Sequence, residues 1–422
     1  MINEIEMTVL PSGLRVITDH VPTVDSVALG IWADVGTRHE DMAHNGVAHM
    51  VEHMLFKGTP TRNAPQIAEQ VENVGGHMNA YTSREVTAYH IHLLKEDANL
   101  ALDILSDMIQ NSTMPDEEIA REQQVILQEI GMTNDTPDDL VFDQYQETAY
   151  PEQALGAPIL GRSDVVSAMT RDTMMDYVQR FYTPKRLVIS AAGNITHDDF
   201  VAQVERSFND LPSDSDQSNG VAADYRGGEH RTEKNLEQSH LILGFQGLSR
   251  VDDDFYAAAV LSTIMGGGMS SRLFQEIREK RGLVYSIFSF HSPFQDDGVF
   301  GIYAGTGPDH LPELVPVLCE EILRAPDNIT ADELKRAKSQ IKASMVMGQE
   351  SMNRRANQQA KHLIHHHEII DMNKNIARID RLEIADIARA AQRIFASKPT
   401  LAGLGPLKKL DSLDRIKGRL AA

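Results

Sequence analysis

Three residues in the segment His49-Met50-Val51-Glu52-His53 have the types and the spacing of a zinc site. The apolar residues between Asn45 and Phe56 recur with helical spacing, which predicts a helix over this stretch. On a helix, His49 and His53 lie one turn apart and can both bind a single Zn²⁺, while Glu52 projects from nearly the same side. The less specific interpretation is a surface helix that carries these three residues by chance.

A catalytic zinc ion needs three protein ligands and an open position, so a third ligand is expected elsewhere in the chain. The acidic helical segment 116–130 offers two candidates, Glu122 and Glu129, which are two turns apart on nearly the same stripe. One carboxylate could bind the metal while the other orients a ligand or the water of the site. Spacing alone does not rank the two, and two exposed helix carboxylates are the alternative interpretation.

Strand and helix patterns alternate along the chain in an order that occurs twice. The predicted strands are 14–18, 26–35, 77–83, 86–94 and 186–192 in the first half, and 239–245, 286–292 and 299–305 in the second. We therefore predict an α+β fold of two homologous domains with mixed or antiparallel sheets, produced by an internal duplication. The predicted boundaries are 1–212 for a metal-binding domain, 213–233 for a polar linker, and 234–422 for a domain without the metal motif.

Composition and charge argue against several classes of protein. The formal net charge of −21 disfavours nucleic acid as a partner, because phosphate binding needs clustered Lys and Arg. No apolar run approaches the length of about 18 residues that a membrane span requires, so no membrane segment is predicted. The single cysteine, Cys319, fits a reducing compartment, and the acidic start of the chain is unlike a targeting segment. These features predict a cytoplasmic protein, with a bacterial cytoplasm as the simplest setting.

The metal motif and its surroundings resemble the pitrilysin family of zinc peptidases, the inverzincins, whose motif order is the reverse of the commoner one. The similarity is closest to the branch of the mitochondrial processing peptidase and its bacterial homologues. It covers His49–Thr59, Gly75–Glu85, Arg121-Glu122 and Val125–Glu129. The resemblance implies that Glu129 is the third ligand of one Zn²⁺ per chain and that Glu122 supports the site.

The resemblance also implies a zinc-dependent endopeptidase that hydrolyses extended or unfolded peptides. In that activity Glu52 is the general base, which takes a proton from the zinc-activated water and passes it to the leaving amine. The peptide backbone is expected to pair with an edge strand beside the metal. The residues of that strand are Gly76, His77, Met78, Asn79 and Ala80.

The second domain contains Arg278 and Tyr285, which resemble an arginine and a tyrosine that contact substrate near the scissile bond in this family. Both side chains can donate hydrogen bonds to a peptide carbonyl or to its developing oxyanion. Family architecture implies that the chain is half of a clamshell. Because it carries both motifs, we expect a homodimer with composite active sites, in which Arg278 and Tyr285 act on the neighbouring chain.

Two other classes of protein remain as alternatives. The chain could be a non-catalytic assembly subunit of the same family, or a metal-dependent protein that binds peptides without cleaving them. Non-catalytic family members typically lose motif residues, whereas this chain keeps His49, Glu52, His53 and Glu129. A pure binding site also has no need of a general base such as Glu52.

Overall fold

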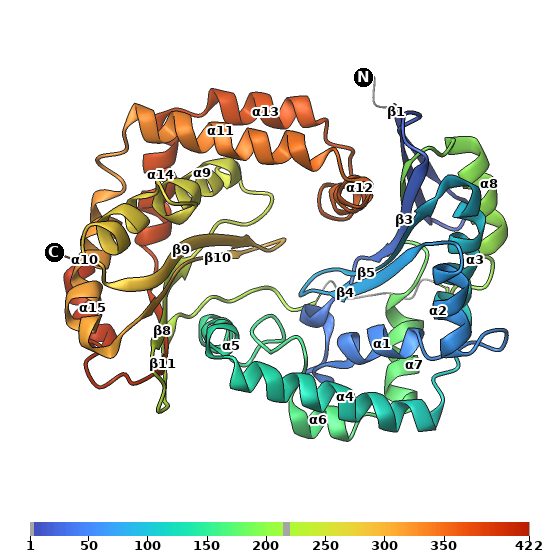
Figure 1. The fold of residues 1–422 in the computed structure, drawn as a ribbon, viewed down its shortest axis with the longest axis horizontal. Coiled ribbons are helices and arrows are strands. Elements are labelled where there is room, and N and C mark those ends of the chain that lie inside the picture. Colours follow the sequence, from blue (N-terminus) through green and yellow to red (C-terminus); the bar gives the residue numbers. More distant parts are fainter. Residues whose placement is uncertain (1–3, 214–219, 422) are drawn as a thin grey trace. The chain divides into compact units, whose positions relative to one another are not determined.

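The computed structural model describes residues 4–213 and 220–421, which form two compact units (Figure 1). Unit 1 consists of residues 4–131, 157–213, 220–221 and 346–370 of the described chain. Unit 2 consists of residues 132–156, 222–345 and 371–421. In the described part of the chain, no helix has both the length and the apolar character that a membrane crossing requires.

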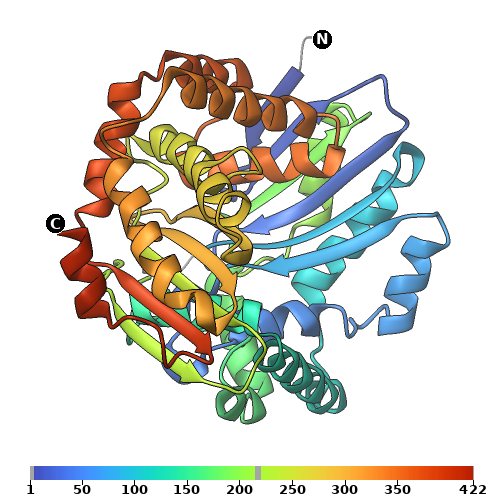
Figure 2. The ribbon, with the colours of Figure 1, turned by 60° about the vertical axis from the view of Figure 1, so that its left-hand side comes forward.

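Unit 1 is built on a six-stranded sheet with the order β1-β2-β6-β3-β5-β4. Its strands are β1 (Glu4–Val9), β2 (Arg15–His20), β3 (Ser26–Ala33), β4 (His77–Thr82), β5 (Thr87–Leu94) and β6 (Leu187–Gly193). Only the pair β2 and β6 is parallel. Strand β4 pairs with β5 alone and forms one edge of the sheet, where Figure 2 shows the two as adjacent light-blue arrows.

Both faces of this sheet are covered by the apolar faces of amphipathic helices, which explains why β3 and β6 read as continuous apolar runs rather than as alternating patterns. The helices of unit 1 are α1 (Val47–Leu55), α2 (Ala64–Glu72), α3 (Ala98–Asn111), most of α4 (Asp116–Asp135), α6 (Ser163–Ser167), α7 (Arg171–Phe181), α8 (His197–Ser207) and α12 (Met352–His366). Leu29 and Ile31 of β3 pack in the core that includes α1 and α3. Ala28 and Trp32 point to the opposite face and pack against α12.

Unit 2 repeats the topology of unit 1. Its sheet has the order β7-β11-β8-β10-β9, in which only β7 and β11 are parallel, as only β2 and β6 are in unit 1. Its strands are β7 (Gly228–Glu233), β8 (Ser239–Gln246), β9 (Val284–Pro293), β10 (Gly298–Thr306) and β11 (Thr400–Gly405). Strands β7, β8, β9, β10 and β11 correspond to β2, β3, β4, β5 and β6, in that order. With this correspondence the order in unit 2 equals the order β2-β6-β3-β5-β4 in unit 1, so the predicted α+β fold with two homologous sheets is confirmed.

One helix from each half of the sequence packs on the sheet of the other half. The helices of unit 2 are α5 (Pro137–Ala149), α9 (Phe255–Gly266), α10 (Leu311–Arg324), most of α11 (Ala331–Gly348), α13 (Met372–Arg381), α14 (Ile384–Phe395) and α15 (Leu413–Leu420). Helix α5 buries Val141 and Tyr145 against β8, β10 and β11, while α12 buries Ala356 and Ala360 against β2, β3 and β6. The compact units are therefore discontinuous and do not coincide with the consecutive ranges 1–212 and 234–422.

The expected linker 213–233 also contains structure. Its residues 214–219 lie outside the described part of the chain, but Gly228–Glu233 form strand β7, parallel to β11. The strand is polar because it lies at the edge of the sheet, where most of its side chains are exposed. Strand β1, an edge strand of unit 1 in which Ile5, Met7 and Val9 alternate with polar residues, is likewise absent from the prediction.

A partly buried histidine in unit 2 makes the stability of the protein dependent on pH. His291 of β9 contacts the backbone oxygen of Leu248 at 2.9 Å, and burial lowers its pKa to about 4. The neutral form is therefore favoured in the folded state, so its stabilisation is complete above the unfolded pKa of about 6.5 and is lost as the pH falls towards 4. We expect the free energy of unfolding to fall by about 1 kcal/mol at this residue between pH 7.5 and 5.5.

Urea unfolding at the two pH values tests this expectation. The variant His291→Gln, which cannot gain this proton, should show a smaller loss of stability at pH 5.5 than the wild type. An identical pH dependence in both proteins would contradict the assignment.

Candidate metal centre

Helix α1 carries His49, Glu52 and His53, and its first turn is held by a residue outside the helix. Its N-cap is Gly46, with φ of +96° and no side chain to cap the free amides. The buried carboxylate of Glu40 takes over that role, because it accepts hydrogen bonds from the amides of Gly46 and Ala48, both at 2.9 Å. The Asn45 side chain donates a third, at 3.0 Å. Burial raises the pKa of Glu40 to about 7, although these hydrogen bonds act to lower it.

The turn before α1 packs directly against the backbone of the loop that contains Gly161. A β-carbon on Gly46 would lie 2.8 Å from the α-carbon of Gly161, so no larger residue fits at this position. The Asn45 amide also donates to the carbonyl of Pro158 at 3.1 Å. The start of α1 is therefore fixed from two sides before any metal binds.

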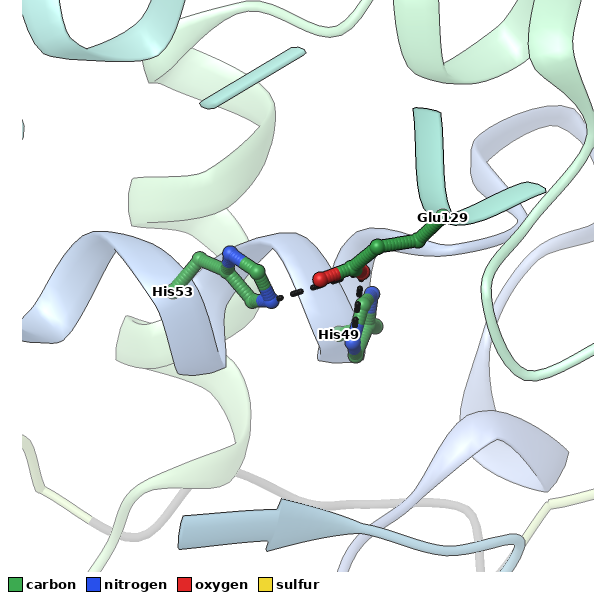
Figure 3. A group of neighbouring side chains, drawn as sticks. All are labelled: His49, His53 and Glu129. Carbon is green, nitrogen blue, oxygen red and sulfur yellow. Dashed lines mark ion pairs between the residues drawn. The ribbon is translucent and has the colours of Figure 1, made fainter. Parts of the chain in front are cut away.

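His49, His53 and Glu129 are brought together by α1 and α4. Figure 3 shows the two imidazoles projecting from one face of α1 towards the Glu129 carboxylate. The Nε2 atom of each histidine lies 3.8 Å from the same oxygen, Oε2 of Glu129. One donor atom from each residue lies within 4.8 Å of the others, and this is the one such group of three in the described residues.

These donors fit a tetrahedral zinc ion. Zinc bonds of about 2.0–2.1 Å to nitrogen and oxygen place neighbouring ligand atoms about 3.3 Å apart, slightly closer than the separations in the group. Two neutral imidazoles and one carboxylate are also a ligand set that zinc uses in peptidases. Burial lowers the pKa of His49 to about 4, with a smaller contribution from His53. His49 is therefore neutral, as a metal ligand must be, at pH 7.

Glu122 lies one layer behind the three donors. His53 donates from Nδ1 to Oε2 of Glu122 at 2.8 Å, which leaves Nε2 of His53 on the side of Glu129. Lys57 contacts the other oxygen of Glu122 at 2.7 Å. Partial burial acts to raise the pKa of Glu122, but the hydrogen bonds from Lys57 and His53 outweigh it and lower the pKa. An ionised Glu122 orients the His53 ring and selects its tautomer.

Glu52 lies on the same helix but outside the group of three donors. Its Oε2 atom accepts a hydrogen bond of 2.5 Å from the hydroxyl of Thr82. Burial raises the pKa of Glu52, and Thr82 and His53 oppose the shift. A carboxylate with a raised pKa beside a metal group is suited to accept and return a proton near neutral pH.

The predicted substrate strand lies at the edge of the sheet. His77, Met78, Asn79 and Ala80 form most of β4, and Gly76 immediately precedes it. The structure pairs β4 with β5 on one side only, and α1 packs against β4. Within the described residues no strand pairs with its other side, so that an additional strand can bind there, although the Ala80 amide already donates to the Asn79 side chain at 2.8 Å.

Arg278 and Tyr285 belong to unit 2. Arg278 lies in the π-helical segment Phe274–Glu279, with its guanidinium 4.8 Å from the centre of the Phe274 ring. Tyr285 lies near the start of β9 and its side chain is largely exposed (64 %). Their action on a metal group stays a prediction.

Sequence reasoning did not identify Glu40, Lys57 or Thr82. Glu40 left one usable signal, an acidic residue seven positions before a helix whose own N-cap is glycine. Thr82 left none, because a threonine in a strand is ordinary. Its distance to Glu52 depends on how the strand packs on the helix.

Comparison with known sequences matches most of the chain to two family models. Residues 15–163 match the model described as "Insulinase (Peptidase family M16)", and residues 168–341 match "Peptidase M16 inactive domain". An "uncharacterized zinc protease" of Rickettsia bellii is 42 % identical over 398 residues, 94 % of this chain and 96 % of the relative. The "uncharacterized zinc protease YmxG" of Bacillus subtilis is 38 % identical over 409 residues, 95 % of this chain and 98 % of the relative.

Solved structures agree with the fold. A crystal structure of a protease from Helicobacter pylori superposes with a TM-score of 0.89 and 23 % identity, over 96 % of this chain and 100 % of that one. At this level of identity the likeness establishes the fold alone. Together with the sequence matches and the metal motif, these comparisons show that the chain belongs to peptidase family M16, the pitrilysin family of zinc peptidases.

Proposed function

We propose that this protein is a zinc-dependent endopeptidase that hydrolyses extended or unfolded peptides. The observation that carries the proposal is the group His49, His53 and Glu129, with Glu52 on the same helix. Relatives named zinc proteases support the same class of activity. The match of residues 168–341 to an inactive domain fits a chain in which only the first half carries the metal motif.

Each side chain of the site in unit 1 has a separate role in the proposed reaction. His49, His53 and Glu129 would hold one zinc ion per chain, which supplies a water of lowered pKa and polarises the scissile carbonyl. Glu52 accepts the proton of the attacking water and then delivers it to the nitrogen of the leaving amine. Glu122 keeps the His53 ring oriented throughout, because its carboxylate remains bonded to Nδ1.

Strand β4 offers the substrate a place to bind. A peptide that adds to its free edge is held by backbone hydrogen bonds, which tolerate many sequences and require an extended conformation. Most extended segments of a folded protein are already paired within its own sheets. We therefore expect short or unfolded peptides to be the substrates.

The alternative is a peptide-binding or assembly subunit that does not catalyse. The match to an inactive domain favours this alternative in one respect, because such domains occur in this family. The chain nevertheless keeps Glu52, which a binding subunit does not need, so catalysis is the better proposal. A cytoplasmic location stays a prediction.

We further propose that two copies of the chain form a homodimer with composite active sites. The support is that one chain carries both the metal group and the pair Arg278 and Tyr285. A two-fold dimer gives both copies the same interface, so two equivalent sites result.

Replacing Glu52 by Gln tests the proposed reaction. The amide keeps the shape of the side chain but cannot accept the proton, so kcat should fall at least about 100-fold while zinc content is unchanged. The measurements are cleavage of a mixed peptide library by mass spectrometry and metal analysis of the purified protein. Cleavage by Glu52→Gln at the wild-type rate would show that the assignment is wrong.

Replacing Glu122 by Gln tests the support of the metal. Loss of the charged acceptor for His53 should weaken zinc affinity about 10- to 100-fold, measured by competition with a chelator. The matched control is Glu117→Gln, because Glu117 is an exposed carboxylate on the same helix. This substitution should leave the zinc affinity nearly unchanged. The wild type should bind about one zinc ion per chain. Equal affinities of the Glu122→Gln variant and the wild type would exclude this role.

Mixing two inactive variants tests the composite sites. Glu52→Gln and Arg278→Ala are each expected to be inactive alone. If each site uses Glu52 of one chain and Arg278 of the other, a mixed dimer contains one intact site, and random exchange restores about a quarter of wild-type activity. Sites contained in a single chain would give no recovery, although the dimers mix.

A further inference from the structure

The hydroxyl of Thr82 is bonded directly to the proposed general base. Its Oγ1 donates to Oε2 of Glu52 at 2.5 Å. Within residues 4–213 and 220–421, Thr82 is the one hydrogen-bond donor to this carboxylate. The other oxygen, Oε1, therefore remains available to a proton of the attacking water.

The helix side of this hydrogen bond is held rigidly. Glu52 lies on α1, whose first turn is anchored by the buried carboxylate of Glu40 and by close packing of Gly46 on Gly161. Val51 and Met54, which flank Glu52 and His53, are fully buried in the core of unit 1. The backbone of Glu52 is therefore fixed, but its side chain retains three rotatable bonds.

The backbone that carries Thr82 is also held in place. Thr82 is the last residue of β4, and the turn that follows is bonded to the segment 37–38: the amides of Thr37 and Arg38 donate to the carbonyls of Ser83 and Arg84 at 3.1 and 2.9 Å. The approach is so close that a β-carbon on Gly36 would lie 2.2 Å from the Ser83 carbonyl oxygen.

A buried ion pair also joins the turn after β4 to the segment 37–38. Arg38 contacts Glu85 at 2.6 Å, and both side chains are less than a tenth exposed. Removing either partner would leave a charge in the protein interior, so the contact keeps the turn in one position. The hydroxyl of Thr82 thus lies on a fixed frame, as a group that orients a catalytic side chain must.

We propose that Thr82 is a positioning residue for catalysis, which fixes one oxygen of Glu52 so that the other meets the attacking water. This inference rests on the proposed peptidase function and adds the element that orients its base. Because Thr82 ends the strand proposed to pair with substrate, the base and the peptide backbone take their positions from one segment of chain. Loss of the hydroxyl leaves Glu52 and the metal donors present but lets the carboxylate rotate.

Replacing Thr82 by Val and by Ser separates the hydroxyl from the bulk of the side chain. Thr82→Val removes the donor and keeps a β-branched shape, so kcat should fall about 10- to 100-fold with KM and zinc content unchanged. Thr82→Ser keeps the donor and should retain most of the wild-type kcat. Both constants are measured with a fluorogenic peptide, alongside metal analysis and thermal unfolding.

The matched control is Thr18→Val. Thr18 is a buried threonine on β2 of the same unit, where its hydroxyl bonds the His197 ring at 2.8 Å. Loss of that bond should lower the unfolding temperature without changing kcat, which is the behaviour of a purely structural threonine.

A variant Thr82→Ala provides the same loss of the donor if the added methyl group of Val is not accommodated.

The outcomes are distinct. Wild-type kcat in Thr82→Val or in Thr82→Ala overturns the inference, as does a Ser variant as slow as the Val variant, or a loss expressed in KM alone. If Glu52→Gln is inactive while Thr82→Val is normal, only the role of Thr82 fails. If Glu52→Gln is fully active, the proposed function fails with it.

Discussion

The buried carboxylate of Glu40 determines where helix α1 begins, and the metal group depends on that start. Two imidazoles one turn apart can share a metal only if the helix that carries them does not fray, and His49 lies just two residues after the first helical residue. Glycine at the N-cap permits close packing against Gly161 but leaves the first amides without a side-chain acceptor. Glu40 supplies the acceptor from the turn seven residues before the helix, and its charge, when the group is ionised, is also favourable at the positive end of the helix.

The charges around the metal donors are arranged in layers. Glu129 faces the Nε2 atoms of both histidines, whereas Glu122 takes the opposite side of the His53 ring and is neutralised in part by Lys57. Glu52 remains outside both layers and is bonded to Thr82. Three acidic side chains therefore share a small volume with separate functions, because each has a different partner.

The duplicated topology shows what the metal site requires beyond a fold. Unit 2 has the same strand order and a helix, α9, at the position of α1. Its residues Leu261–Met265 offer apolar and hydroxyl side chains instead of donors for zinc. The exchange of α5 and α12 between the halves covers each sheet with a helix from the other half of the sequence. The sheet is thus common to both units, and the group of candidate metal ligands belongs to two helices of unit 1, α1 and α4.

The sequence by itself indicated most of the elements and predicted the type of metal site. Apolar periodicity is a local property, so it located α1, α4 and the inner strands, and the spacing of His49, Glu52 and His53 on one turn indicated zinc. Strand β7 lacked that signal because its side chains are mostly polar and exposed, whereas β1 carried it, with Ile5, Met7 and Val9 alternating with polar residues, and was missed.

Spacing left Glu122 and Glu129 equivalent, and only resemblance to a family separated them. The structure gives the physical reason, since α4 brings the Glu122 carboxylate to 2.8 Å from Nδ1 of His53 and the Glu129 carboxylate to 3.8 Å from Nε2 of the same ring. The anchoring by Glu40, the bond from Thr82 to Glu52 and the placement of α12 were likewise decided by tertiary structure, because each joins residues whose separation in sequence carries no periodic signal.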